Sequence, residues 1–184
     1  MVFGLALLVL IAGALIFVGV IYNNLVGLRV RADSSWSDID VQLKRRHDLI
    51  PNLVETVKGY AGHEKSTFEN VTKYRSMAMQ ATGPAERAEA EGQLTMALKS
   101  LFAVAENYPQ LRASENFTSL QKSLAEIEDN LQNARRYYNA VVRDLNTAIQ
   151  LFPSNLVAGM FNFQQRAFFE LGAAAEREAP EVKF

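Results

Sequence analysis

The sequence predicts an all-α protein in which an N-terminal transmembrane helix continues into an antiparallel four-helix bundle, followed by an additional short C-terminal helix. One observation is that residues 1–22 carry no charged side chain. The other is that apolar residues in the rest of the chain, which is rich in Leu, Ala, Glu and Arg, recur at the helical spacings of three and four. We expect a transmembrane anchor over 1–22, a cytosolic helical bundle over 23–171 and a disordered tail over 172–184, where small and charged residues predominate.

The uncharged N-terminal run is long enough to cross a bilayer. At about 1.5 Å per residue it spans roughly 33 Å, against about 30 Å for the hydrocarbon core. The apolar part of a secretory signal is shorter, about 7–15 residues, and the only trio that resembles a cleavage site, Ala12-Gly13-Ala14, lies in mid-run. We therefore expect an uncleaved, single-pass anchor and a lipid bilayer as the first partner.

Basic residues after the run predict its orientation. Arg29 and Arg31 follow it closely, and Lys44, Arg45 and Arg46 lie further on. Basic residues near the end of a span are retained on the cytoplasmic side, so we expect the bundle in the cytosol and a short N-terminus outside. The absence of cysteine fits a reducing compartment. The formal net charge of −1, with basic and acidic residues interleaved, argues against nucleic acid as a partner.

The first bundle helix continues the anchor as one rod. Its apolar stripe contains Trp36, Ile39, Leu43, Ile50, Leu53, Val54, Val57 and Ala61. Pro51 has no backbone N–H for the His47 carbonyl, so a bend is expected near 47–51.

Three more bundle helices follow. The second is expected over 64–81 and the third over 84–107, where Pro84 suits a first helical position and Pro109 ends the pattern. The fourth, from about Ser114–Phe117 to Phe152-Pro153, has an unbroken heptad seam of Leu120, Leu124, Ile127, Leu131, Ala134, Tyr138, Val141, Leu145, Ala148 and Phe152. Two long and two shorter helices fit an up-down-up-down bundle, which returns residues 152–155 to the bilayer surface.

The last helix is expected over 155–171 and has a broad apolar face. That face contains Leu156, Val157, Met160, Phe161, Phe163, Ala167, Phe168 and Leu171. Three readings stay open: packing against the chain's own rod, contact with another subunit, or insertion at the membrane interface.

Several short segments together resemble the LemA family. They are Tyr22-Asn23-Asn24-Leu25-Val26, the block from Trp36 to Tyr60, His63-Glu64-Lys65, Glu106-Asn107-Tyr108-Pro109, Glu115-Asn116-Phe117, Ala134-Arg135-Arg136-Tyr137-Tyr138-Asn139 and Phe152-Pro153-Ser154-Asn155. The resemblance implies a protein of the bacterial cytoplasmic (inner) membrane with an N-terminal span and an antiparallel helical bundle. It implies no reaction, and it suggests HtpX-type membrane proteases as one class of partner.

No catalytic, cofactor-binding or metal-binding residues are expected. A di-iron carboxylate centre in a bundle needs two Glu-x-x-His pairs, whereas His47 and His63 are preceded at that spacing by Lys44 and Tyr60. There is no zincin motif and no cysteine ligand. His47 and Asp48 are adjacent on a helix and point apart, so they predict no base with its orienting acid.

A few polar residues interrupt the apolar pattern. Arg46 falls on the seam and is expected to pair with an acid of the fourth helix, Glu128 or Glu126, with a role in partner binding as the alternative. Asp48, Pro51 and Asn52 form the expected bend, and Asn52 is a candidate to satisfy the carbonyl that the proline frees. Asn107, Tyr108 and Pro109 are expected to end the third helix, with a docking surface at this end of the bundle left open.

Two functions remain at this point. The first is a scaffold without enzymatic activity that forms homo-oligomers in the membrane through its bundle faces or its last helix. The second is an adaptor or regulator of a membrane enzyme, such as a protease. If the last helix is the oligomer contact, replacing Phe161 and Phe168 with Ser should disrupt assemblies and leave the monomer folded.

Overall fold

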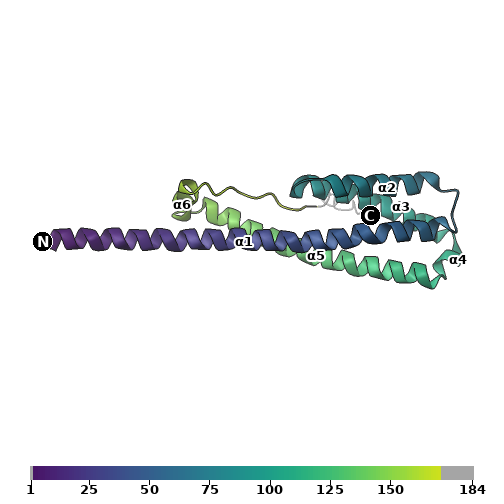
Figure 1. The fold of residues 1–184 in the computed structure, drawn as a ribbon, viewed down its shortest axis with the longest axis horizontal. Helices are drawn as coiled ribbons and strands as arrows, with labels where there is room; N and C mark the ends of the chain where they lie inside the picture. The colour runs from purple at the N-terminus through teal and green to yellow at the C-terminus, as the bar shows by residue number, and fades with distance from the viewer. Residues whose placement is uncertain (1, 171–184) are drawn as a thin grey trace, which may run out of the picture. The chain divides into compact units, whose positions relative to one another are not determined.

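The computed structural model describes residues 2–170 and is helical, with no strand among these residues. Its helices are α1 (Val2–Lys58), α2 (Lys65–Gln80), α3 (Pro84–Glu106), α4 (Pro109–Arg112), α5 (Glu115–Gln150) and α6 (Ser154–Met160) (Figure 1). The all-α prediction is confirmed for the described part of the chain. The expected tail, 172–184, and Leu171 lie outside it.

The described residues divide into two compact units, which we treat separately. Unit 1 contains residues 2–38 and 136–167, and unit 2 contains residues 39–135 and 168–170. Helices α1 and α5 each contribute one part to both units.

Helix α1 begins with the apolar run and continues without interruption to Lys58. Among the described residues it is the one helix long and apolar enough to cross a membrane. Side chains such as Leu5, Leu10 and Phe17 in its apolar run are exposed. Pro51 lies inside the helix and does not end it.

Unit 2 has an apolar core to which α1, α2, α3, α4 and α5 all contribute. Its fully buried residues include Leu53 and Val57 of α1, Val71 of α2, and Leu94 and Leu101 of α3, and α5 adds Phe117 and Leu124. Helices α2 and α3 lie side by side (Figure 1). Between α3 and α5 lies α4, a single turn that the sequence did not predict; it begins at Pro109, a residue suited to a helix start, and its Leu111 is fully buried in this core.

A local hydrogen-bond pattern marks the start of α3. Gly83 has φ 77°, which glycine adopts without strain, and Pro84 follows as the first helical residue. The backbone N–H of Thr82 donates to Glu86 Oε2 at 3.0 Å, and the Thr82 hydroxyl donates to the same oxygen. These bonds favour the carboxylate and lower the pKa of Glu86, the backbone bond having the larger effect.

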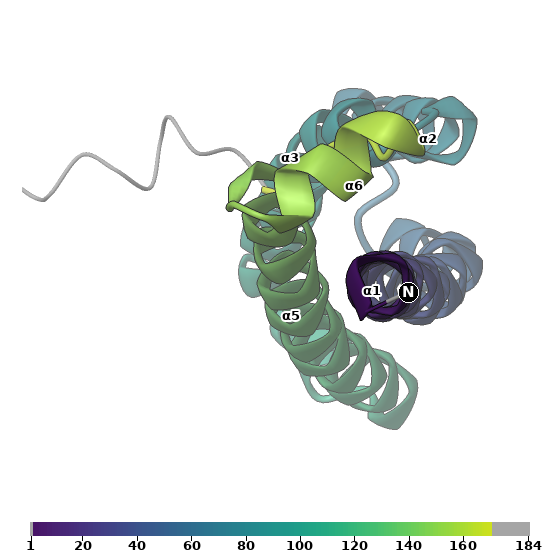
Figure 2. The same ribbon diagram turned by 90° about the vertical axis from the view of Figure 1, so that its left-hand side faces the viewer.

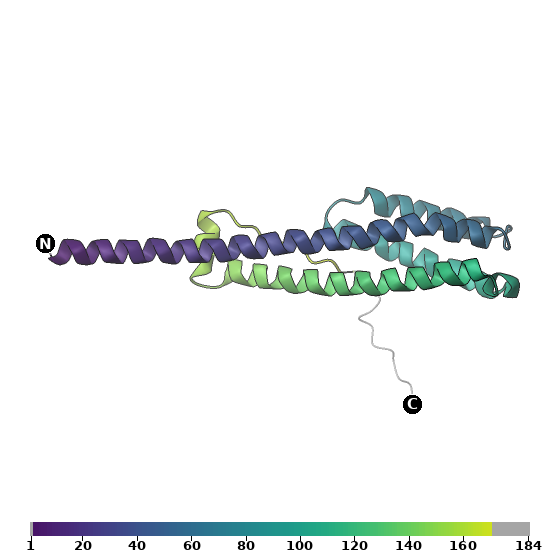
Figure 3. The same cartoon turned by 60° about the horizontal axis from the view of Figure 1, so that its bottom comes forward.

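Unit 1 joins the first part of α1 to the end of α5 and to α6. Trp36 and Tyr138 stack with ring centroids 5.3 Å apart. A second apolar cluster contains Leu25, Val157, Ala158 and Phe163. Figure 2 shows α6 turning across the end of α5, and Figure 3 shows the chain returning along α5 after α6.

The expected helix over 155–171 is wrong in its extent, because α6 ends at Met160. Asn162 has φ 54°, a left-handed conformation that asparagine tolerates. The N–H of Phe163 donates to the Ala158 carbonyl at 2.9 Å, and the N–H of Asn162 donates to that of Gly159 at 3.3 Å. This is a Schellman motif, with Phe163 and Ala158 in apolar contact. The residues predicted to share one helical face therefore do not share it.

Candidate functional site

Unit 2 contains a buried cluster of charged and polar side chains centred on Arg46. Arg46 is 1% exposed and Glu91 is fully buried. Arg46 Nη1 donates to Glu91 Oε2 at 2.5 Å, and Nη2 donates to Glu128 Oε1 at 2.7 Å. Nη2 also lies 2.8 Å from Thr95 Oγ1. The cluster thus links α1, α3 and α5 through a single guanidinium group.

His47 completes this cluster. Its Nε2 lies 2.6 Å from Glu91 Oε1, so the two carboxylate oxygens of Glu91 have different partners. The Thr95 hydroxyl donates to the Glu91 carbonyl at 2.9 Å and so has its proton engaged. No hydroxyl in the cluster is paired with a free base, and within residues 2–170 no group of three His, Asp or Glu side chains is placed to hold a metal ion. The arrangement connects helices and has no evident nucleophile.

Glu128 and Glu126 were the two acids predicted to pair with Arg46. In the structure Glu128 forms the ion pair, whereas Glu126 is exposed. Glu91 was not foreseen as a partner. Its signal was present in the sequence, because it lies three residues before Leu94 on the same apolar stripe.

Arg75 supplies the hydrogen bond that Pro51 removes from α1. Its Nε donates to the His47 carbonyl at 2.7 Å, and this carbonyl is the one that would accept from residue 51 in a regular helix. Asn52, the residue expected to satisfy it, is exposed, and so is Asp48. The expectation for Asn52 is therefore wrong, because a residue from α2 reaches the carbonyl across the core.

We predict that Arg75→Met destabilises the protein by about 1–3 kcal/mol, because the partly buried His47 carbonyl loses its donor. The measurement is thermal unfolding in mild detergent, followed by circular dichroism. In a Pro51→Ala background the alanine N–H can bond to this carbonyl, so the same Arg75 substitution should cost less than about 0.5 kcal/mol. An equal cost in both backgrounds would contradict this assignment.

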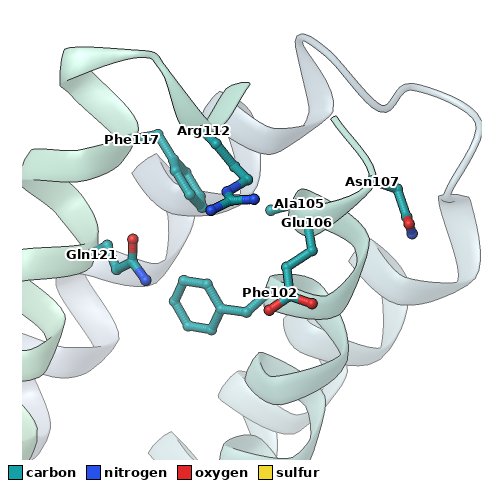
Figure 4. Close-up of a pocket in the computed structure, with 7 residues that line it drawn as sticks. All are labelled: Phe102, Ala105, Glu106, Asn107, Arg112, Phe117 and Gln121. Carbon is teal, nitrogen blue, oxygen red and sulfur yellow. The ribbon is translucent and has the colours of Figure 1, made fainter. Parts of the chain in front are cut away.

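The turn from α3 through α4 to α5 surrounds an open cavity of about 580 Å³. Its lining contains Phe102, Ala105, Glu106, Asn107, Arg112, Phe117 and Gln121 (Figure 4). The exposed Glu106 and Arg112 carry opposite charges at its edge, while Phe102 and Phe117 contact each other with ring centroids 6.2 Å apart. A pocket with aromatic walls and one charge of each sign has the chemistry to hold a peptide segment.

The three residues expected to end the third helix lie at this turn. Asn107 follows α3 and its Nδ2 donates weakly to the Ala103 carbonyl at 3.4 Å. Tyr108 packs against the core of unit 2, and Pro109 begins α4. Their backbone and packing positions are those of residues that shape a turn.

The C-terminal apolar residues have different surroundings. Val157 and Phe163 are buried in unit 1, whereas Leu156, Met160 and Phe161 are exposed. Phe168 is 39% exposed and belongs to unit 2. Phe169, which the helical pattern did not include, is fully buried.

After α6, residues 163–167 form an extended strap whose backbone bonds to side chains of α5. Asn146 Oδ1 accepts from the Arg166 N–H at 2.8 Å, and Asn146 Nδ2 donates to the Arg166 carbonyl at 2.9 Å. The Tyr138 hydroxyl donates to the Ala167 carbonyl at 2.9 Å. The Arg166 guanidinium pairs with Asp33 at 2.7 Å. Polar side chains of α5 and the ion pair between Arg166 and Asp33 thus hold the strap in place.

Burial raises the pKa of Tyr138 above its ordinary value of 10.0; Arg166 opposes this rise and Asp33 adds to it. The folded state therefore holds the phenol proton more tightly than the unfolded state. The resulting stability is complete below pH 10 or so and is lost as the pH rises through the folded pKa.

We expect the parent protein to melt at a higher temperature than Tyr138→Phe near pH 8, and we expect this difference to shrink above about pH 10. The physical reason is that the phenolate cannot donate to the Ala167 carbonyl. Parallel melting curves between pH 8 and 11 provide the measurement. A difference that stays constant over this range would argue against a role for the phenol proton.

Comparison with known proteins identifies similar sequences. The model of the LemA family matches residues 35–184. Magnetosome protein MamQ 2 of Paramagnetospirillum magneticum is 26% identical over 175 residues, covering 81% of this chain and 64% of that protein. Magnetosome protein MamQ of Magnetospirillum gryphiswaldense is 25% identical, with 80% and 64% covered. Protein LemA of Metamycoplasma hominis is 27% identical, with 87% and 72% covered. The chain thus spans just under two thirds of the length of the MamQ relatives.

Proposed function

The chain belongs to the LemA family, and from this premise we propose that it is a membrane-anchored helical scaffold that self-associates at the bacterial cytoplasmic membrane. The observation that carries the proposal is α1. An uncharged segment with exposed apolar side chains continues, in the same helix, into the core of unit 2. Such a helix holds a folded unit at the bilayer and leaves that unit free to bind other proteins.

The proposed arrangement is a single span with the bundle in the cytosol. Arg29 and Arg31 support this orientation, since they lie within two to three turns of the end of the uncharged run. Short connections between α1, α2, α3 and α5 support an antiparallel four-helix bundle in unit 2. We assign the Arg46 cluster a structural role in this bundle, because its charged groups already bind one another.

Self-association is proposed to begin in the membrane. Anchored copies are confined to two dimensions, so a weak contact between spans is enough to hold an assembly together. Three relatives are named as magnetosome proteins, and a role in organising a cellular structure fits that name better than a role in a reaction.

The test is the mass of the full-length protein in mild detergent, by light scattering with detergent correction and negative-stain images. We expect a defined assembly of several copies. In a matched variant, residues 2–17 are replaced by leucines, which preserve the span and remove its specific shape but retain Val18, Ile21 and Tyr22, which pack against α6. Loss of assembly in this variant would place the contact in the anchor. A monomeric parent protein would refute the scaffold.

The cavity at the α3–α4–α5 turn favours a second function, that of an adaptor for a membrane enzyme such as an HtpX-type protease. A photo-crosslinking residue in place of Gln121, which lines the cavity, should then capture that enzyme in cells. The neighbouring exposed Lys122 provides the control position. Equal capture from both positions would show that the cavity has no special part in the contact.

A further inference from the structure

We propose that residues 151–161 form a second membrane contact. They form an apolar wedge that enters the boundary between headgroups and acyl chains, in the leaflet that contains the C-terminal end of the anchor. The wedge is defined by the side chains of Leu151, Phe152, Leu156, Met160 and Phe161. This inference rests on the membrane anchoring of α1, which is part of the proposed function, and it is independent of self-association.

The exposure of these side chains is the first argument. Phe152 is 78% exposed, Met160 74%, and Leu151 and Leu156 59% each. On the other side of α6, Val157 and Ala158 are buried at 4% and 2%. Helix α6 therefore exposes Leu156 and Met160 beside Asn155, whereas a helix at a water-exposed surface normally has a predominantly polar outer side. A concentrated apolar patch of this kind marks a contact with a protein or a membrane.

The position of the wedge identifies lipid as the occupant. Helix α6 packs against the last part of the uncharged run in α1, in a cluster that includes Val18, Ile21 and Tyr22. The rings of Tyr22 and Phe161 have centroids 4.7 Å apart. Tyrosine is enriched where a span leaves the hydrocarbon, so Tyr22 marks the level of the headgroups. The exposed side chains next to it are thus continuous with the surface that faces the bilayer.

Charge supports the same occupant. The stretch from Leu145 to Gln165 contains no Asp, Glu, Lys, Arg or His. Arg29 lies beside this part of unit 1, with its guanidinium carbon 5.2 Å from the centroid of the Phe163 ring. An uncharged apolar segment bordered by arginine matches the interface, where acyl chains end and phosphates begin.

The chain contains no cysteine, so a single introduced cysteine can report the depth of one residue. We would label Met160→Cys in the full-length protein with an environment-sensitive nitrobenzoxadiazole dye. The protein would then be reconstituted in phosphatidylcholine–phosphatidylglycerol vesicles. Met96→Cys in α3, where the methionine is 64% exposed, is the matched control, and Leu10→Cys reports the anchor.

The proposal predicts that lipids with a nitroxide near the headgroup quench the label at 160 at least about twofold more than the label at 96, with iodide showing the opposite order. Adding Phe152→Ser and Leu156→Ser should abolish the lipid quenching at 160. Both substitutions leave the buried residues Val157 and Ala158 unchanged. Circular dichroism checks that the fold is retained.

Equal access of iodide to the labels at 160 and 96, with the label at 10 quenched by lipid, would overturn the wedge and leave the anchor intact. Protection at 160 from both quenchers would also overturn it and would indicate a second copy of the chain. Absence of lipid quenching at 10 would refute the anchoring itself, on which the wedge depends.

Discussion

Replacing Glu91 with leucine is expected to destabilise the protein by about 3–5 kcal/mol, because the substitution leaves the Arg46 guanidinium buried without its principal partner. His47 loses its contact with the carboxylate at the same time. For a chain of this size the melting temperature should fall by roughly 6–20 °C. Thermal unfolding in mild detergent, monitored by circular dichroism at 222 nm, measures the effect.

Two controls separate the buried charge from the loss of packing. Glu128→Gln removes the other partner of Arg46, but Glu128 is 39% exposed, and its loss should cost no more than about 1 kcal/mol. Combining Glu91→Leu with Arg46→Met removes both charges, and the double variant should be more stable than Glu91→Leu alone. A double variant that melts below the single one would show that the pair itself, and not the isolated charge, determines stability.

Replacing Asn146 with alanine should free the strap from α5 at a cost of about 2–4 kcal/mol, because the Arg166 N–H and carbonyl both lose their partners. The amide hydrogen of Arg166, which bonds to Asn146 Oδ1, should then exchange roughly 30 to 700 times faster, if local opening carries the whole cost. Hydrogen exchange with mass spectrometry reads this directly. Asn155→Ala, at an exposed position nearby, should leave the exchange unchanged.

Helical periodicity predicted the helices well where long seams face a core. The fourth predicted helix corresponds to α5, which has 36 residues, and α2 and α3 begin and end within a residue of their expected bounds. These elements are amphipathic, so burial of their apolar stripes determines both their type and their extent.

The last helix was predicted too long, because a local helix-ending signal at Asn162 outweighed the helical spacing of the apolar residues. Apolar residues from Leu156 to Phe168 happen to recur at helical spacing, yet Asn162 takes the left-handed conformation and the Schellman bonds end α6. Beyond that point the chain is no longer helical, and only Phe163, Arg166 and Phe169 are buried or partly buried among residues 163–170. The sequence signal for this helix end was Asn162 followed by Phe163, because asparagine tolerates the left-handed conformation and an apolar residue often follows it in a Schellman motif.

Polar contacts between helices were predicted only in part, for a physical reason. The pattern shows that Arg46 is on the seam and must be paired, because an unpaired buried charge is costly. It does not determine which acid approaches, since that depends on the axial stagger and rotation of three helices. The bond from Arg75 to the His47 carbonyl joins residues 28 positions apart, and the contact of His47 with Glu91 joins residues 44 positions apart. The contact of Arg46 with Thr95 joins residues 49 positions apart, and all three lie beyond the range of any local pattern.

The bond from Arg75 to the His47 carbonyl makes the stiffness of α1 conditional. A proline in a rod is a weak joint, and here the joint is braced by a side chain that another helix contributes. While α2 is docked, the Arg75 side chain satisfies the carbonyl for which the helix itself has no donor. If α2 detaches, the bond from Arg75 is lost, and we expect α1 to bend first at Pro51. The two events are therefore mechanically linked: bending of α1 reports on the docking of a helix that begins 14 residues after the proline.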